Sequence, residues 1–188
     1  MSNQTAKKLH QDGVTLFRRG QLDEAFQKLQ EALQNADEAS REKAEIYNDL
    51  GVIHTQREDY EAAYEALNEA MERFTNADDR RGQGQTLGNL AATLQSEGDL
   101  ERAVETYKMA ATYLEEAGQN DMAMYVWQAI SKIRMKQGQY IAAIGAYEEG
   151  IEKMPENSFK RKIMRQILKA PNSLLGGGGG SKKEDDDD

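Results

Sequence analysis

Few side chains in this sequence are of the types that carry catalysis or bind metal ions. The chain has 2 histidines and no cysteine, which excludes a disulfide framework and a thiolate metal site. His10 and His54 lie far apart, and neither has cysteines or paired carboxylates at ligand spacing. Gly82-Gln83-Gly84 lacks the preceding strand and the following Gly-Lys-Ser/Thr of a phosphate-binding loop. We therefore predict no enzyme activity, no catalytic residue, no metal site and no cofactor.

The charged residues favour protein partners over nucleic acid. The net charge of −9 argues against a protein that binds a phosphate backbone. Cations nevertheless gather toward the C-terminal part of the chain, at Lys132, Lys136, Lys160, Arg161, Lys162 and Arg165. Such a cluster could accept an acidic peptide. It could equally be a solvated surface that complements the C-terminal ends of helices.

One helical unit, repeated four times, positions these side chains. In the clearest copy, Gly98 ends one helix and Asp99 caps the next. Small residues that permit close helix contacts recur at intervals of 38 or 40 residues, at Ala25, Ala63, Ala103 and Ala143. The four repeats span about residues 6–39, 42–78, 82–118 and 121–155. A further helix over residues 157–170 is expected to cover the last pair with its apolar residues Phe159, Ile163, Met164, Ile167 and Leu168.

The repeat resembles the tetratricopeptide repeat (TPR) over about Ala6 to Pro155. The residues that carry the resemblance are Leu50-Gly51, Ala63, Trp127 and Pro155. The period exceeds the family's usual 34 residues, and segments 76–84 and 116–121 look like the extended inter-repeat turns of kinesin light chain and Pins-type adaptors. The resemblance implies an all-α fold. We expect a right-handed α-solenoid of four helix pairs with a C-terminal capping helix, forming a TPR domain over residues 1–171.

In this family the first helix of each repeat lines a concave groove. Helical spacing along those helices, together with the cations of the last helix, predicts a peptide-binding set of Asn48, Val52, Asn89, Tyr125, Gln128, Lys132, Lys136, Arg161, Lys162 and Arg165. Amides can pair with the backbone of an extended peptide, and Asn89 matches an Asn that peptide-binding members use in this way.

The family's carboxylate clamp for chaperone C-termini does not transfer to this chain. That clamp is built from two Lys, two Asn and an Arg. In one register its positions hold His10, Val14, Asp49, Gln85 and Asn89. In the other register they hold Asn48, Val52, Asn89, Tyr125 and Ala129. Binding of ordinary heat-shock-protein tails is therefore not expected.

The composition changes abruptly after Pro171. Residues 172–181, which contain five consecutive glycines and Ser181, are interpreted as an engineered flexible linker. Residues 182–188 are interpreted as a fused partner tail that serves as a tethered ligand, made of Lys182, Lys183, Glu184, Asp185, Asp186, Asp187 and Asp188. We expect Asp185–Asp188 of this tail to lie beside Lys132, Lys136 and the helix that carries Lys160–Arg165, in the same chain or exchanged into a neighbouring one.

These features together predict a non-enzymatic adaptor that binds a short acidic C-terminal peptide of a partner protein in its concave groove. The alternative is a scaffold that docks a folded partner or associates with itself, with the tail only an expression aid. The polar start Met1–Lys8 does not resemble a signal peptide, and no apolar run approaches 18 residues. We accordingly predict a cytoplasmic protein with no nucleic-acid partner and no membrane insertion.

Overall fold

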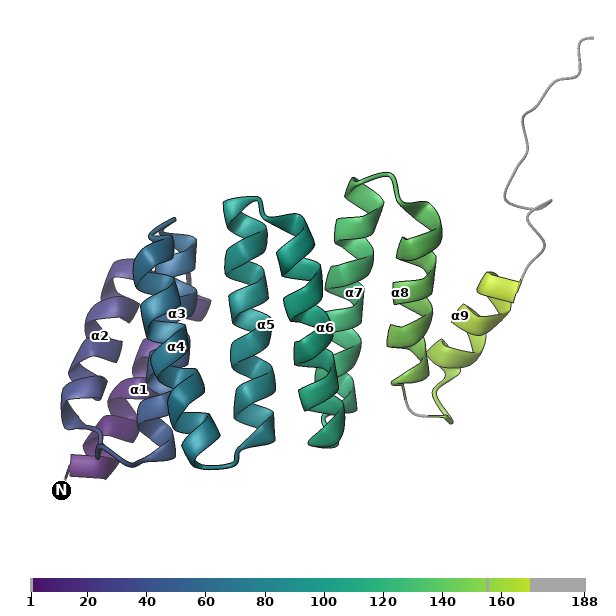
Figure 1. Ribbon diagram of the computed structural model, residues 1–188. Coiled ribbons are helices and arrows are strands. Elements are labelled where there is room, and N and C mark those ends of the chain that lie inside the picture. The colour runs from purple at the N-terminus through teal and green to yellow at the C-terminus, as the bar shows by residue number, and fades with distance from the viewer. Residues whose placement is uncertain (1, 155, 170–188) are drawn as a thin grey trace, which may run out of the picture.

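The protein is a row of antiparallel helix pairs, seen side by side in Figure 1. The computed structural model describes residues 2–154 and 156–169. Within these ranges it contains nine α-helices and no strand. The helices are α1 (Ser2–Arg18), α2 (Leu22–Asn35), α3 (Arg41–Gln56), α4 (Tyr60–Asn76), α5 (Arg80–Glu97), α6 (Leu100–Glu116), α7 (Asn120–Lys136), α8 (Tyr140–Glu152) and α9 (Phe159–Lys169). The predicted all-α solenoid of four helix pairs followed by a ninth helix is confirmed.

The turn between the two helices of a pair is built by short-range chemistry. After α5, Gly98 adopts a φ of 99°, which an L-residue with a side chain rarely adopts. The Asp99 side chain then accepts a hydrogen bond from the Arg102 backbone N–H and caps α6. Asp59 caps α4 in the same way. The chain therefore reverses at the positions that the repeat pattern indicates.

Small residues allow the two helices of a pair to approach closely. Ala25, Ala63, Ala103 and Ala143 each have 0% of their surface exposed. At Gly51 on α3, a Cβ atom would lie only 2.5 Å from the Leu67 Cγ on α4. The helices of this pair would have to move apart to accommodate a larger residue. This is the reason why the repeat requires small residues at fixed positions.

The apolar core continues from one pair into the next. Ile46, Leu50 and Ile53 of α3 pack with Ala25 and Leu29 of α2. Farther along, Ile130 and Ile133 of α7 share a cluster with residues of α5 and α6. Each pair buries its apolar surface against its neighbours, as expected for a solenoid. No helix in the described ranges is long and apolar enough to cross a membrane.

The ninth helix differs from the expected cap in the face that it buries. Phe159 is 77% exposed and Ile163 is 39% exposed, whereas Arg161 is buried. The Arg161 guanidinium donates to the Met154 backbone carbonyl at 2.8 Å and to the Glu152 carboxylate. These polar contacts attach the start of α9 to the end of α8, and Figure 1 shows α9 diverging from α8 beyond that point. Phe159 and Ile163 therefore do not cover the last pair as expected, whereas Met164 of the expected apolar set is half-buried and its sulfur lies 3.6 Å from the Tyr147 hydroxyl oxygen of α8.

Candidate functional site

The first helices of the four pairs form a row, and this row opens at its C-terminal part. Helix α1 contacts α3, and α3 contacts α5, but α5 and α7 make little direct contact. Thr55 and Thr93 hold α3 and α5 together through their hydroxyl oxygens, 2.8 Å apart. Beyond α5 the surface is hollowed beside α7. The row therefore has a closed N-terminal part, where α1, α3 and α5 contact one another in turn, and an open C-terminal part, where a cavity lies beside α7.

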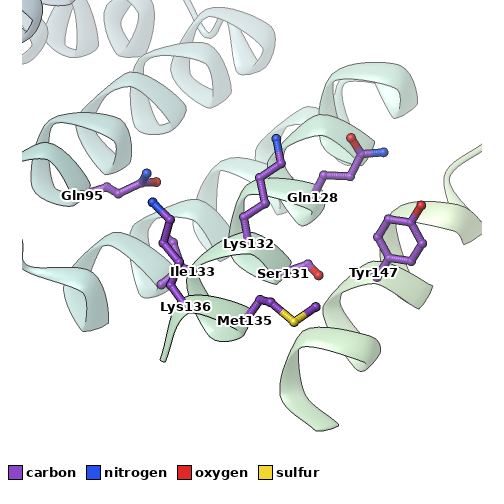
Figure 2. A pocket seen from close by; sticks show the side chains of 8 residues that line it. All are labelled: Gln95, Gln128, Ser131, Lys132, Ile133, Met135, Lys136 and Tyr147. Carbon is purple, nitrogen blue, oxygen red and sulfur yellow. The ribbon is translucent and has the colours of Figure 1, made fainter. Parts of the chain in front are cut away.

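The largest described cavity at the open part has a volume of about 650 Å³. Gln95 comes from α5, Tyr147 from α8 and the other lining residues from α7, and the full set is Gln95, Gln128, Ser131, Lys132, Ile133, Met135, Lys136 and Tyr147. Figure 2 shows the Lys132 and Lys136 side chains extending from α7, with Gln95 of α5 lining the same cavity. Gln128, Lys132 and Lys136 of the predicted peptide-binding set thus line one cavity.

The two lysines of this cavity have no ion-pair partner among the described residues. Both are exposed. Arg134, which lies between them in sequence, instead donates to the Glu101 carboxylate at 2.7 Å. Helix α7 therefore uses one cation to bind the neighbouring pair and presents two others to solvent. Two unpaired cations beside Met135, which is 52% exposed, form a surface that attracts an anionic group carrying an apolar neighbour.

A second cavity of about 390 Å³ lies farther toward the N-terminus along α7. It brings together Asn48 of α3, Asn89 of α5 and Tyr125 of α7, all from the predicted set. The Asn89 amide donates to the Asn48 side-chain oxygen at 3.0 Å. The Asn89 oxygen and the Asn48 NH₂ group make no other hydrogen bond in the described structure. They remain available to an extended backbone, which needs one donor and one acceptor at such a place.

The N-terminal part of the row is closed by His10, which has no candidate partner at ligand spacing in the sequence. His10 Nδ1 lies 2.6 Å from a Glu42 carboxylate oxygen, and His10 Nε2 lies 2.7 Å from an Asp49 oxygen. Burial of the ring disfavours the imidazolium, but the hydrogen bonds to Asp49 and Glu42 outweigh it, so the pKa of His10 is raised above its ordinary value of 6.5. One sequence feature could have indicated these contacts of His10. Glu42 and Asp49 are seven residues apart and therefore lie on one face of α3.

The remaining predicted site residues lie apart from both cavities. Val52 is half-buried on α3 and lines neither one. Lys162 is exposed on α9. Arg165 and Arg161 both bind Glu152, and these two contacts, with Arg165 first, lower the pKa of Glu152. We therefore assign Arg161 and Arg165 to the attachment of α9 and leave them out of the candidate site. Residues 182–188 lie outside the described part of the chain.

Comparisons with known proteins identify the family of this chain. Residues 19–170 match the soluble NSF attachment protein (SNAP) family. The chain belongs to the SNAP family. The SNAP-family chain is also 31% identical over 130 residues to the photosystem I assembly protein Ycf3 of Prochlorococcus marinus (strain NATL2A), covering 68% of this chain and 70% of that protein. These matches confirm the prediction of a tetratricopeptide repeat protein.

Solved structures share the fold of this SNAP-family chain at lower identity. BtubC (BKLC) from P. vanneervenii superposes with a TM-score of 0.67 and 18% identity, covering 96% of this chain and 68% of that one. A Rap protein complexed with competence and sporulation factor superposes with a TM-score of 0.74 and 20% identity, covering 80% of this chain and 43% of that one. These neighbours show the fold, and the family match and the Ycf3 relative support a protein-interaction role.

Proposed function

We propose that this chain is a non-enzymatic cytoplasmic adaptor that captures an acidic peptide segment of a partner protein on the row of first helices. The observation that carries the proposal is the pair of unpartnered lysines, Lys132 and Lys136, at the cavity of about 650 Å³. Carboxylates of the peptide bind these ammonium groups, and an adjacent apolar side chain contacts the exposed Met135. The partner segment is therefore acidic and carries an apolar side chain next to its carboxylates.

The amides along the row supply the second part of the proposed interaction. Asn48 and Asn89 sit in the neighbouring cavity and keep one donor and one acceptor for a peptide backbone. Both cavities lie along α7, so one extended segment can contact both. The Rap structure supports this use of the fold, because that protein is complexed with competence and sporulation factor.

The acidic residues 182–188 are proposed as such a segment, tethered to the groove by the glycines. From Lys169, the last residue that the structure describes, to Asp185 the chain advances by about 16 residues, which reach at most about 53–58 Å when extended. Neighbouring helices pack about 8–10 Å apart, so α7 lies within that reach. A short flexible linker also gives the tail an effective concentration in the mM range, which is enough to fill a weak site.

The test uses protein lacking residues 176–188, so that the tail cannot compete, and a free peptide ending in the Asp run. We expect the truncated protein to remain folded and to bind the peptide at low salt. Lys132→Glu/Lys136→Glu should weaken the affinity at least about tenfold, which is 1.4 kcal/mol. The matched control, Lys7→Glu/Lys8→Glu, reverses the same number of charges on α1 and should leave the affinity unchanged. Loss of binding in both variants alike, or in neither, contradicts the proposal.

A scaffold that docks a folded partner is the second candidate, and one observation favours it. Large apolar side chains stand exposed near the C-terminal end of the solenoid, with Ile141 89% exposed, Phe159 77% and Tyr140 63%. Exposed apolar surface of this kind marks protein contact sites. If the truncated, folded protein ignores the acidic peptide at low salt, this second function replaces the first.

A further inference from the structure

The closed end of the row contains a cluster of ligand atoms that the proposed function does not use. One ligand atom each of His10, Glu42 and Glu45 lies within 4.8 Å of the other two. His10 is buried and the two glutamates are half-buried. The glutamates are three residues apart near the start of α3 and share a face, and His10 approaches them from α1. Imidazole nitrogen and carboxylate oxygen are ligands for Zn²⁺ and related divalent metals.

The second imidazole nitrogen is already held as it would be in a metal site. His10 Nε2 lies 2.7 Å from the Asp49 carboxylate, so an Nε2–H can donate to it. A metal-ligating histidine nearly always donates its other N–H to a carboxylate or carbonyl, which fixes the tautomer and the ring orientation. With the proton on Nε2, the lone pair of Nδ1 faces the Glu42 carboxylate, and an oxygen of Glu45 belongs to the same cluster of ligand atoms. The ring is thus oriented by a residue that is not itself a ligand.

We propose that His10 Nδ1, Glu42 and Glu45 bind one divalent transition-metal cation, with Asp49 as the positioning residue. Binding replaces the proton on Nδ1, which passes to solvent. The charges of the cation and the two carboxylates cancel around the neutral imidazole. The cation joins α1 to α3, so it stabilises the contact between the first two helix pairs.

Only small movements of side chains are needed to admit the cation. Ligands about 2.0–2.2 Å from a tetrahedral Zn²⁺ lie about 3.3 Å from one another, whereas His10 Nδ1 and the Glu42 oxygen are 2.6 Å apart. Glu42 must therefore withdraw by less than an ångström. Glu45 must leave Arg41, which it contacts at 2.8 Å. Arg41 keeps a second partner, because it also contacts Asp79 at 2.7 Å.

Glu45→Gln is the decisive variant. Glu45 makes no hydrogen bond or ion pair with His10 in the described structure, so its replacement leaves the His10 bridge to Glu42 and Asp49 in place and removes one proposed metal ligand. Zn²⁺ is titrated into the full chain by calorimetry. We expect one Zn²⁺ per chain with proton release, an affinity at least about tenfold lower for Glu45→Gln, and one about 10–100-fold lower for Asp49→Asn. Glu61→Gln, an exposed glutamate on α4, is the matched control and should bind as the parent does.

The histidine ring signals in an NMR spectrum give a second readout that is independent of stability. The chain has only 2 histidines, so His54 serves as an internal reference. Zn²⁺ should shift the His10 ring signals and leave those of His54 in place. The proposal is overturned if Zn²⁺ fails to shift His10, or if Glu45→Gln and Glu61→Gln bind Zn²⁺ equally well. Binding that survives in Glu45→Gln without moving His10 assigns the ion to other carboxylates and also overturns it.

Discussion

The two ends of the first-helix row treat their charged residues in opposite ways. At the N-terminal end, His10 is buried and both ring nitrogens meet carboxylates of α3. At the C-terminal end, Lys132 and Lys136 are exposed and have no ion-pair partner in the described chain. The same repeat therefore produces one end that is satisfied internally and one that is open to a partner. The difference lies in whether the next first helix supplies a countercharge.

This contrast indicates where the chain gains stability and where it can bind a peptide. Charges that are paired inside the fold cannot attract a ligand without losing those partners. Unpaired surface cations contribute little to folding but remain available for association. Single and double variants separate the contribution to stability from the contribution to binding, from the largest expected effect to the smallest.

Gly51→Leu should cause the largest loss, because it disrupts the packing that holds the closed end. A Cβ atom at this position already lies 2.5 Å from Leu67 Cγ, so we expect the upper part of the 1–3 kcal/mol typical of overpacking. In a solenoid with nearest-neighbour coupling, the damage should concentrate in α1–α5 and spare α7 and α8. Hydrogen exchange measured helix by helix checks this.

Gly145→Ala is the matched control for that experiment. A Cβ atom on Gly145 of α8 meets nothing within 4 Å, and alanine favours a helix over glycine by about 0.5–1 kcal/mol. The control should therefore be neutral or stabilising. Equal loss of protection in both halves of the Gly51→Leu protein would show that the two ends are one cooperative unit, contrary to the comparison.

His10→Ala and Lys132→Ala/Lys136→Ala should give opposite results. Removing His10 leaves the Glu42 and Asp49 carboxylates without their donor, which should lower the free energy of unfolding by about 1–2 kcal/mol. Removing the two lysines should change it by less than about 0.5 kcal/mol while weakening the acidic peptide. Denaturant titration and peptide binding, measured on both proteins, check this pair of predictions. A destabilised lysine variant would mean that the open end is structural.

Salt should distinguish the ends as well. Exposed charges are screened beyond about 10 Å at 0.1 M ionic strength, whereas buried pairs are screened much less. Affinity for the acidic peptide should therefore fall several-fold between 0.05 M and about 0.5 M salt. The stability difference between the parent protein and His10→Ala should hardly change over the same range. A peptide affinity that ignores salt would move the binding site away from Lys132 and Lys136.

The sequence predicts the helix pairs of this molecule better than it predicts the contacts of the charged side chains. The alanines and Gly51 define the helix pairs because close helix contacts tolerate only small residues, and those recur at a visible period. The contacts of His10 depend on the angle between successive first helices, which packing between pairs determines. No pattern within the sequence of α1 alone indicates that angle.

The ninth helix shows a second limit of reasoning from the sequence. Its apolar residues follow helical spacing, yet Arg161 is buried and Phe159 is exposed. The orientation is set by Glu152 and the Met154 carbonyl at the end of α8. A periodic pattern identifies a helix but does not reveal which charged residue finds a partner. The predicted cations consequently divide into Arg161 and Arg165, which bind Glu152, and the exposed Lys132, Lys136 and Lys162.

The smallest expected effect is at α9 and follows from Glu152. Arg165 and Arg161 lower the pKa of Glu152 below its ordinary value of 4.5. A carboxylate whose pKa is lower in the folded state stabilises that state above pH 4.5, and this contribution is lost as the pH falls through the lowered value. Helix α9 should therefore stay protected from hydrogen exchange between pH 7 and pH 5 and lose protection in more acidic solution. Glu152→Gln should already show the weaker protection at pH 7, whereas Glu149→Gln, an exposed neighbour on α8, should behave as the parent. If Glu152→Gln leaves α9 as protected as in the parent at pH 7, the contact of Arg161 with the Met154 carbonyl suffices to hold this helix.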